Sequence, residues 1–223
     1  MATLPPRELK IGTIIDKTLG VVEVAAMPAL IYAVVLTIVT GALAYFTVEM
    51  IAPTQQLMLG LVKFVIGVIA AYVLLEIMVR KTGVRSREGE AVFFAYLGLA
   101  AVSTLGVIVG FILVVLPGLF LMARWSIAAP MLIARGDGAM KSLGESWELT
   151  RGNEFSIIVA ALAILVPLIG ITIACSVLFE RTDPLGIAIS QGTASVMSVL
   201  QLAMSVALYG LIVHARIAVP PAG

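Results

Sequence analysis

The feature that most constrains this chain is a series of long apolar runs, each close to the length that crosses a bilayer. Of its 223 residues, 61% are hydrophobic and 12% are charged. A soluble domain carries roughly 25% charged residues, so this composition leaves too little polar surface to cover a globule in water. About 20 consecutive apolar residues cross the hydrocarbon core as a helix. The chain is therefore predicted to be an all-α, polytopic membrane protein.

The apolar runs predict about six transmembrane helices in a single membrane domain, residues 1–223. Their expected bounds are about 27–48, 57–79, 91–116, 119–134, 155–179 and 186–213. The third and fourth are divided at Pro117-Gly118, because proline lacks an amide proton and glycine permits a turn. An undivided helix over 91–134 would be about 66 Å long, about twice the hydrocarbon thickness. The sequence therefore predicts a tight hairpin at this point.

Two segments that contain both apolar and polar residues predict helices that lie on the bilayer surface. In residues 9–26, Ile11, Ile14 and Thr18 share one face of a helix, opposite polar positions. A solvated N-terminal extension of the first transmembrane helix is an equal alternative for this segment. In residues 137–152, Met140, Leu143 and Trp147 share one face, which predicts a second interfacial helix. These two helices complete the expected fold.

The basic residues predict the orientation. With a cytoplasmic N-terminus, 11 of the 14 Lys and Arg residues lie in cytoplasmic segments. They are Arg7, Lys10, Lys17, Arg80, Lys81, Arg85, Arg87, Arg135, Lys141, Arg151 and Arg216. An even number of transmembrane helices then places both termini in the cytoplasm, and loss of the hairpin would invert the C-terminal half. The charge bias is a second argument for the hairpin.

Arg124 is the sharpest candidate for a functional residue, because it lies inside an apolar run. A charge at mid-bilayer costs roughly 2.5–3.5 kcal/mol on insertion scales, so it normally finds a partner or water. Counting from the hairpin places Arg124 in the outer third of the membrane, and Lys63 at a similar depth. With the neighbouring Trp125, they form a candidate site for a lipid phosphate. The alternatives are that Lys63 snorkels outward and that Arg124 pairs with Glu49 or caps a helix end.

Two further groups are candidate interaction sites. Lys141, Trp147 and Arg151 form a candidate inner-surface interface that meets anionic headgroups, with simple anchoring as the alternative. The last transmembrane helix carries a polar stripe that either bonds to neighbouring helices or lines a water-filled cavity. The stripe consists of Gln191, Ser195, Ser198, Gln201 and Ser205.

Sequence patterns of enzymes are missing, so no catalytic residue and no cofactor are predicted. The only histidine is His214, which excludes an HExxH zinc motif, and the sequence has no GxSxG elbow and no phosphate-binding loop. The single cysteine, Cys175, excludes an internal disulfide and a multi-cysteine metal site. The formal net charge of +1 gives no indication of a nucleic-acid partner. Membrane lipids are the expected partners, and a homo-oligomer or a membrane-protein partner is left open.

One segment resembles a known family. Residues 116–153 read LPGLFLMARWSIAAPMLIARGDGAMKSLGESWELTRGN, and an opening IGTIIDKTLGVV precedes them near the N-terminus. Both are similar to the membrane-domain family attached to some bacterial glycerophosphodiester phosphodiesterases, and to its stand-alone relatives of unknown function. The resemblance implies a bacterial cytoplasmic-membrane protein with about six transmembrane helices. The phosphodiesterase activity belongs to a separate soluble barrel, for which this chain has no room.

The leading hypothesis is a non-enzymatic inner-membrane protein that organises or binds lipid through Arg124 and the adjoining interfacial helix. The polar stripe and the prolines at 130 and 167 favour an alternative, a transporter or channel for a small solute or lipid. The polar segment 135–154 favours a second alternative, a membrane scaffold for a protein partner.

Overall fold

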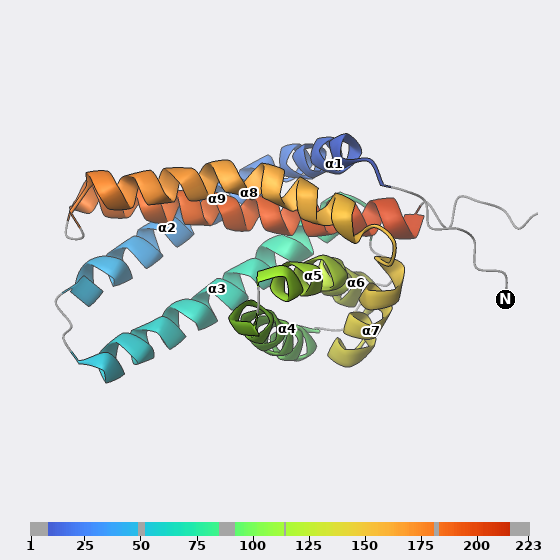
Figure 1. Cartoon of the computed structure of the whole chain (residues 1–223), viewed down its shortest axis with the longest axis horizontal. Coiled ribbons are helices and arrows are strands. Elements are labelled where there is room, and N and C mark those ends of the chain that lie inside the picture. The colour runs from blue at the N-terminus through green and yellow to red at the C-terminus, as the bar shows by residue number, and fades with distance from the viewer. Residues whose placement is uncertain (1–8, 49–51, 85–91, 114, 181–182, 215–223) are drawn as a thin grey trace, which may run out of the picture.

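The computed structural model describes residues 9–48, 52–84, 92–113, 115–180 and 183–214, and these ranges are entirely helical apart from turns and short connections (Figure 1). The helices in chain order are α1 (Ile11–Val24), α2 (Ala26–Val48), α3 (Pro53–Lys81), α4 (Phe93–Leu113), α5 (Val115–Trp125), α6 (Ala128–Arg135), α7 (Ala139–Leu149), α8 (Glu154–Leu178) and α9 (Pro184–Tyr209), followed by a π-helix η1 (Gly210–His214). The all-α fold is confirmed.

Six helical stretches of the described chain are long and apolar enough to cross a membrane. They run over Ala26–Tyr45, Thr54–Lys81, Phe93–Ile112, Leu116–Arg135, Glu154–Leu178 and Pro184–Val213, close to the six predicted ranges. Apolar side chains cover most of their length and face outward, as a chain surrounded by lipid requires. The prediction of a multi-pass helical membrane protein is therefore confirmed.

The predicted hairpin exists, but its turn is not at Pro117-Gly118. Helix α4 ends at Leu113 and α5 begins at Val115, so both residues lie in the first turn of α5. Proline fits there because the first amide groups of a helix have no intrahelical acceptor. Gly118 serves helix packing, since a Cβ at Gly110 would lie 3.0 Å from the Gly118 Cα. A proline-glycine pair that resembles a turn is thus the beginning of a helix.

The predicted fourth helix, 119–134, is also interrupted: α5 ends at Trp125 and α6 begins at Ala128. Pro130 is the cause, because its ring cannot donate to the carbonyl four residues earlier and clashes with it. That carbonyl belongs to Ser126, which lies in the break. The break therefore divides the predicted fourth helix into α5 and α6.

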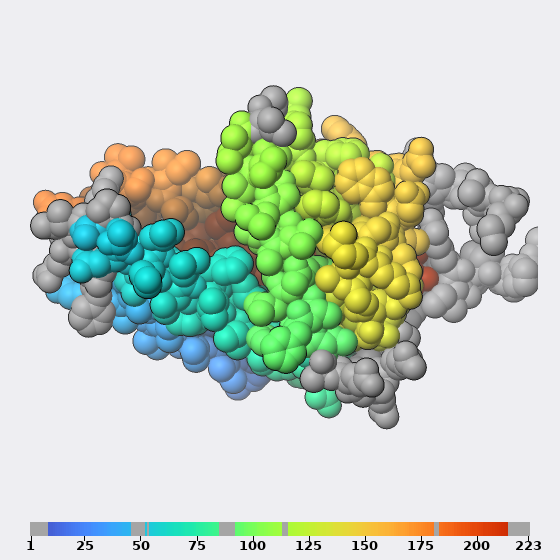
Figure 2. Space-filling model, turned by 90° about the horizontal axis from the view of Figure 1, so that it is seen from below, coloured from blue at the N-terminus to red at the C-terminus, as the bar shows by residue number. Residues whose placement is uncertain are grey.

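The α4–α5 hairpin lies across the other long helices. Figure 1 shows α2, α3, α8 and α9 running along the long axis of the molecule, whereas α4 and α5 are seen almost end-on. In the perpendicular view of Figure 2, the green α4 crosses the end of the cyan α3. Transmembrane helices packed as a bundle lie within about 40° of the bilayer normal. The crosswise direction of the hairpin was not predicted from the sequence.

The two predicted interfacial helices correspond to α1 and α7, and both also pack against the protein. Helix α1 buries Ile14, Thr18 and Val21 against α8 and α9. Helix α7 buries Ser142, Leu143 and Ser146. The apolar face predicted for α7 is therefore only partly used, because Met140 is 72% exposed and small hydroxyl residues face the protein.

The buried core gathers at one end of the molecule, where α1, α6, α7, the end of α3 and the end of α9 meet. We call this the packed end. It contains the largest fully buried side chains, among them Leu75, Met78, Met131, Leu132 and Tyr209. At the other end α2 and α3 diverge from the paired α8 and α9 (Figure 1). We call this the open end, and its apolar side chains, such as Leu61 and Ile38, are more than half exposed.

Candidate functional site

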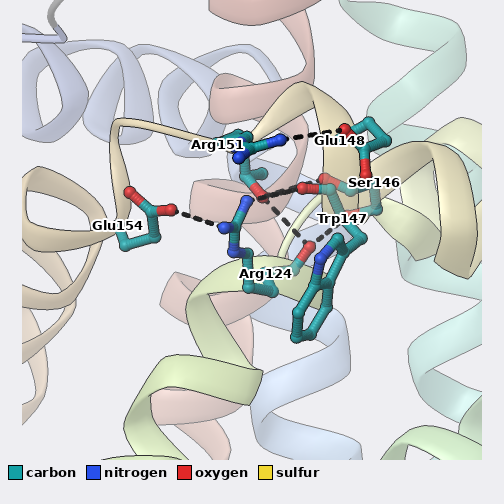
Figure 3. Close-up of polar contacts among 7 residues, drawn as sticks. Arg124, Ser146, Trp147, Glu148, Arg151 and Glu154 are labelled. Atoms are coloured by element: carbon teal, nitrogen blue, oxygen red, sulfur yellow. Dashed lines mark hydrogen bonds and ion pairs between the residues drawn. The ribbon is translucent and has the colours of Figure 1, made fainter.

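Arg124 is the centre of a polar junction that joins α5, α7 and α8 (Figure 3). Its guanidinium Nη2 lies 2.8 Å from the Glu154 Oε1, and its Nη1 donates a 2.7 Å hydrogen bond to the Trp147 carbonyl. The guanidinium carbon also lies 5.0 Å and 4.9 Å from the ring centroids of Phe120 and Trp147. Only 8% of the Arg124 side chain is exposed. The charge is therefore balanced by a carboxylate, a helix-end carbonyl and two aromatic rings.

The buried face of α7 bonds to the backbone of the same arginine. Ser146 Oγ donates to the Arg124 carbonyl at 2.7 Å, and Thr150 Oγ1 donates to it at 3.3 Å. At the end of the same face, Asn153 Oδ1 accepts a 2.8 Å bond from the Leu9 amide. Ser142, Ser146 and Thr150 are four residues apart and wholly buried, so they form one stripe of the helix. Through Ser146 and Thr150 this stripe fixes the end of α5 to α7, and the Arg124–Glu154 ion pair links α5 to α8.

The predicted cation pair of Arg124 and Lys63 is not brought together. Arg124 lies at the packed end, where it contacts α7 and α8. Lys63 lies in the half of α3 that diverges toward the open end (Figure 1). Trp125 packs on Gly106 of α4, where a Cβ would lie 2.5 Å from the indole ring. These three residues therefore form no common phosphate site.

The structure is closer to the alternative interpretation of Arg124, in which it pairs with a carboxylate or caps a helix end. The arginine pairs with a carboxylate, but the partner is Glu154, and Glu49 lies outside the described residues. It also bonds to a carbonyl in the last turn of α7, as a helix cap does. The membrane depth expected for Arg124 stays a prediction.

The three residues predicted to form an inner-surface interface have different surroundings in the structure. Trp147 turns inward to Phe120, with ring centroids 5.7 Å apart, and its side chain is only partly exposed. Lys141 is paired with Asp137 at 2.6 Å, and this hydrogen bond raises the pKa of Lys141 above its ordinary value. Arg151 lies 4.0 Å from the Glu148 carboxylate and is 74% exposed. Lys141 and Arg151 remain on the surface, whereas Trp147 belongs to the Arg124 junction.

The polar stripe of α9 bonds mainly to α2. Tyr32 OH lies 2.7 Å from Ser198 Oγ, and Thr37 Oγ1 donates to Ser195 Oγ at 3.1 Å. Ser195 is 2% exposed, so this part of the stripe is dry. Ser205 donates to a carbonyl of its own helix, Gln201 is exposed, and Gln191 lines a small cavity at the open end. The pattern agrees with helix packing and counts against a continuous water-filled pathway.

Two cavities lie at opposite ends of the molecule. One, about 430 Å³, is an open pocket lined by α2, α8 and α9 at the open end, beside Cys175 and Gln191. The other, about 600 Å³, lies at the packed end between α1, the end of α3 and the end of α9. Its lining includes Lys17 and Lys81. Among the described residues, no group of three or more His, Cys, Asp or Glu is placed to hold a metal ion.

Comparison with known proteins gives no match: no protein-family model, no curated protein and no solved structure matches this chain. The resemblance of residues 116–153 to the membrane-domain family therefore stays a prediction. The structure does give that segment a physical meaning. Four of its residues, Arg124, Ser146, Trp147 and Thr150, contribute to the Arg124 junction.

Proposed function

We propose that this chain is a non-enzymatic membrane protein of the bacterial inner membrane that organises lipid, by inserting the α4–α5 hairpin into one leaflet. The observation that supports this most is the crosswise direction of a hairpin whose only charged residue among those described is Arg124, at its base (Figures 1 and 2). Helix α4 contains no charged residue, and Leu105, Ile112 and Leu116 are 64%, 77% and 73% exposed. Such surfaces are stable only against acyl chains.

The hairpin differs from an ordinary interfacial helix. A helix at the headgroup level needs one polar face, whereas α4 carries no charge and its only polar side chains are Tyr96, Ser103 and Thr104. It therefore belongs within the hydrocarbon region, where its backbone groups are satisfied inside the helix. A helix of 21 residues is about 31 Å long, so a hairpin in the membrane plane displaces lipid on one side of the bilayer only. That asymmetry changes lipid packing around the protein.

Arg124 has a positioning role in this proposal. The ion pair with Glu154 and the hydroxyl bonds from α7 hold the base of the hairpin rigidly at the packed end. A loosely held hairpin would tilt until it followed the neighbouring helices. The earlier hypothesis of direct lipid binding by Arg124 is replaced, because every strong contact of its terminal nitrogens is made within the protein.

The test is reconstitution of the full chain into vesicles at increasing protein-to-lipid ratio, with vesicle diameter measured by electron microscopy. The wild-type chain is expected to reduce the diameter or to form tubules. Ile112→Asp places a carboxylate near the tip of the hairpin, where mid-bilayer charges cost roughly 2.5–3.5 kcal/mol, and should abolish the effect.

Val177→Asp is the matched control, since Val177 is 78% exposed but lies near the end of α8. This variant should remodel vesicles as the wild type does. The proposal is wrong if the wild-type chain leaves the vesicles unchanged, or if Ile112→Asp and Val177→Asp have equal effects.

A further inference from the structure

The cavity at the packed end has apolar walls. Val21 of α1 and Val206 and Ala207 of α9 are nearly fully buried and form its inner surface. Its volume of about 600 Å³ lies within the range of ligand sites in proteins, which is roughly 300–1,000 Å³. In lipid, an open apolar groove of this kind between helices suits a hydrocarbon chain.

Two lysines supply the polar part of the lining. Lys17 comes from α1 and Lys81 from the last turn of α3, and both are exposed. Lys81 Nζ donates a 3.3 Å bond to the Val24 carbonyl, which uses one of its three donors. Lys17 forms no ion pair within the described part of the chain, and the lining includes no carboxylate. The entrance is therefore cationic.

Small residues and an irregular helix end create the space. A Cβ added at Gly20 would meet no atom within 4 Å, so this glycine opens the α1 side of the cavity. On the opposite side, α9 changes to the π-helix at Gly210, which also lines the cavity. Single π-helical turns within α-helices are frequently found at functional sites.

We infer that this cavity binds one anionic phospholipid, with its phosphate near Lys17 and Lys81 and an acyl chain along Val21 and Val206. Basic pockets between membrane helices on the cytoplasmic side suit anionic headgroups, and most basic residues in the described part of the chain lie at the packed end. A zwitterionic headgroup fits less well, since no carboxylate lines the cavity to hold its ammonium group. This inference rests on the proposed lipid-organising function and names a specific lipid site for it.

The test is native mass spectrometry of the full chain in detergent containing either phosphatidylglycerol or phosphatidylcholine. The wild type should retain one phosphatidylglycerol per chain in preference to phosphatidylcholine. Lys17→Gln and Lys81→Gln should each weaken retention about fivefold, the effect of one basic residue near an anionic lipid surface. Lys10→Gln is the charge control, because Lys10 does not line the cavity, and it should retain the lipid fully.

Gly20→Leu tests the apolar part without changing charge. The added side chain should project into the cavity from Gly20 and compete with the acyl chain, whereas Gly12→Leu on the same helix also meets open space but lies outside the lining. Equal retention by both glycine variants, equal retention of the two lipids by the wild type, or displacement of the lipid by inorganic phosphate would overturn the inference. Thermal unfolding of each variant checks that the fold is kept.

The vesicle experiment separates this inference from the proposed function. The lysine variants should still change vesicle shape, since the hairpin is intact in them. Ile112→Asp should lose vesicle remodelling and still retain phosphatidylglycerol, because the cavity lies among α1, α3 and α9 and not on the hairpin.

Discussion

The packed end and the open end of the molecule are both built from apolar helices, but the apolar side chains are buried at the first and exposed at the second. At the packed end α3 buries Leu74, Leu75, Met78 and Val79, whereas its first half exposes residues such as Leu61. No hydrophobic force joins helices within lipid, so close packing and polar contacts must hold them together. The packed end has both, through its dense core and the Arg124 junction. Stability is therefore expected to reside there, and the open end is left to lipid.

The largest expected effect concerns the ion pair of the junction. Glu154→Gln leaves the buried Arg124 without its carboxylate, and breaking such a pair costs about 3 kcal/mol of unfolding free energy. Glu148→Gln is the control, because Glu148 is 69% exposed and lies 4.0 Å from its partner Arg151. That exposed pair should contribute less than about 1 kcal/mol. Denaturant titration in mixed micelles measures both, and equal losses would contradict the role of the junction.

A pair of substitutions within α3 sharpens the comparison directly. Leu75→Ala leaves a cavity in the packed core and should cost about 2 kcal/mol, the low end for such changes because the unfolded reference remains in lipid. Leu61→Ala removes the same atoms where the side chain is 55% exposed, and should cost less than about 0.5 kcal/mol. The unfolding free energies of the two variants, measured in micelles, give this comparison. Similar costs at the two positions would show that the ends do not differ.

A smaller effect is expected for the hydroxyl stripe of α7. Ser146→Ala removes the buried donor to the Arg124 carbonyl and should cost about 1 kcal/mol. Ser176→Ala removes a bond from an exposed hydroxyl to a carbonyl of its own helix, and should leave stability nearly unchanged. Thermal unfolding midpoints of the two variants give the comparison. If Ser146→Ala is as stable as Ser176→Ala, the stripe does not hold the junction.

The sequence predicted the number of apolar helices well, because length and hydropathy carry that information locally. It located the hairpin from Pro117-Gly118 and the charge bias, but misplaced the turn, since the first turn of a helix accepts proline as readily. The direction of α4 cannot be predicted from the sequence, because the length of an apolar run does not determine the tilt of the helix.

The site was harder to predict than the fold. Arg124 was identified as unusual, yet its partner Glu154 lies 30 positions later at the start of another helix. The four-residue spacing of Ser142, Ser146 and Thr150 is a pattern that indicates a buried polar face. From the sequence, an apolar face is instead predicted on the same helix. The cavity with Lys17 and Lys81 joins three distant segments, and no local pattern could indicate it.

The most direct test of the central claim is the membrane depth of two labels on α4. Phe94→Cys and Ile112→Cys, at side chains 82% and 77% exposed, carry a fluorophore in a Cys175→Ala background. Quenching by lipids brominated at different depths then reports both positions. A hairpin in the membrane plane predicts the same depth for the two labels, on the packed-end side of the bilayer. Depths that differ by about 27 Å, the helical rise over 18 residues, would show that α4 crosses the membrane and contradict the account.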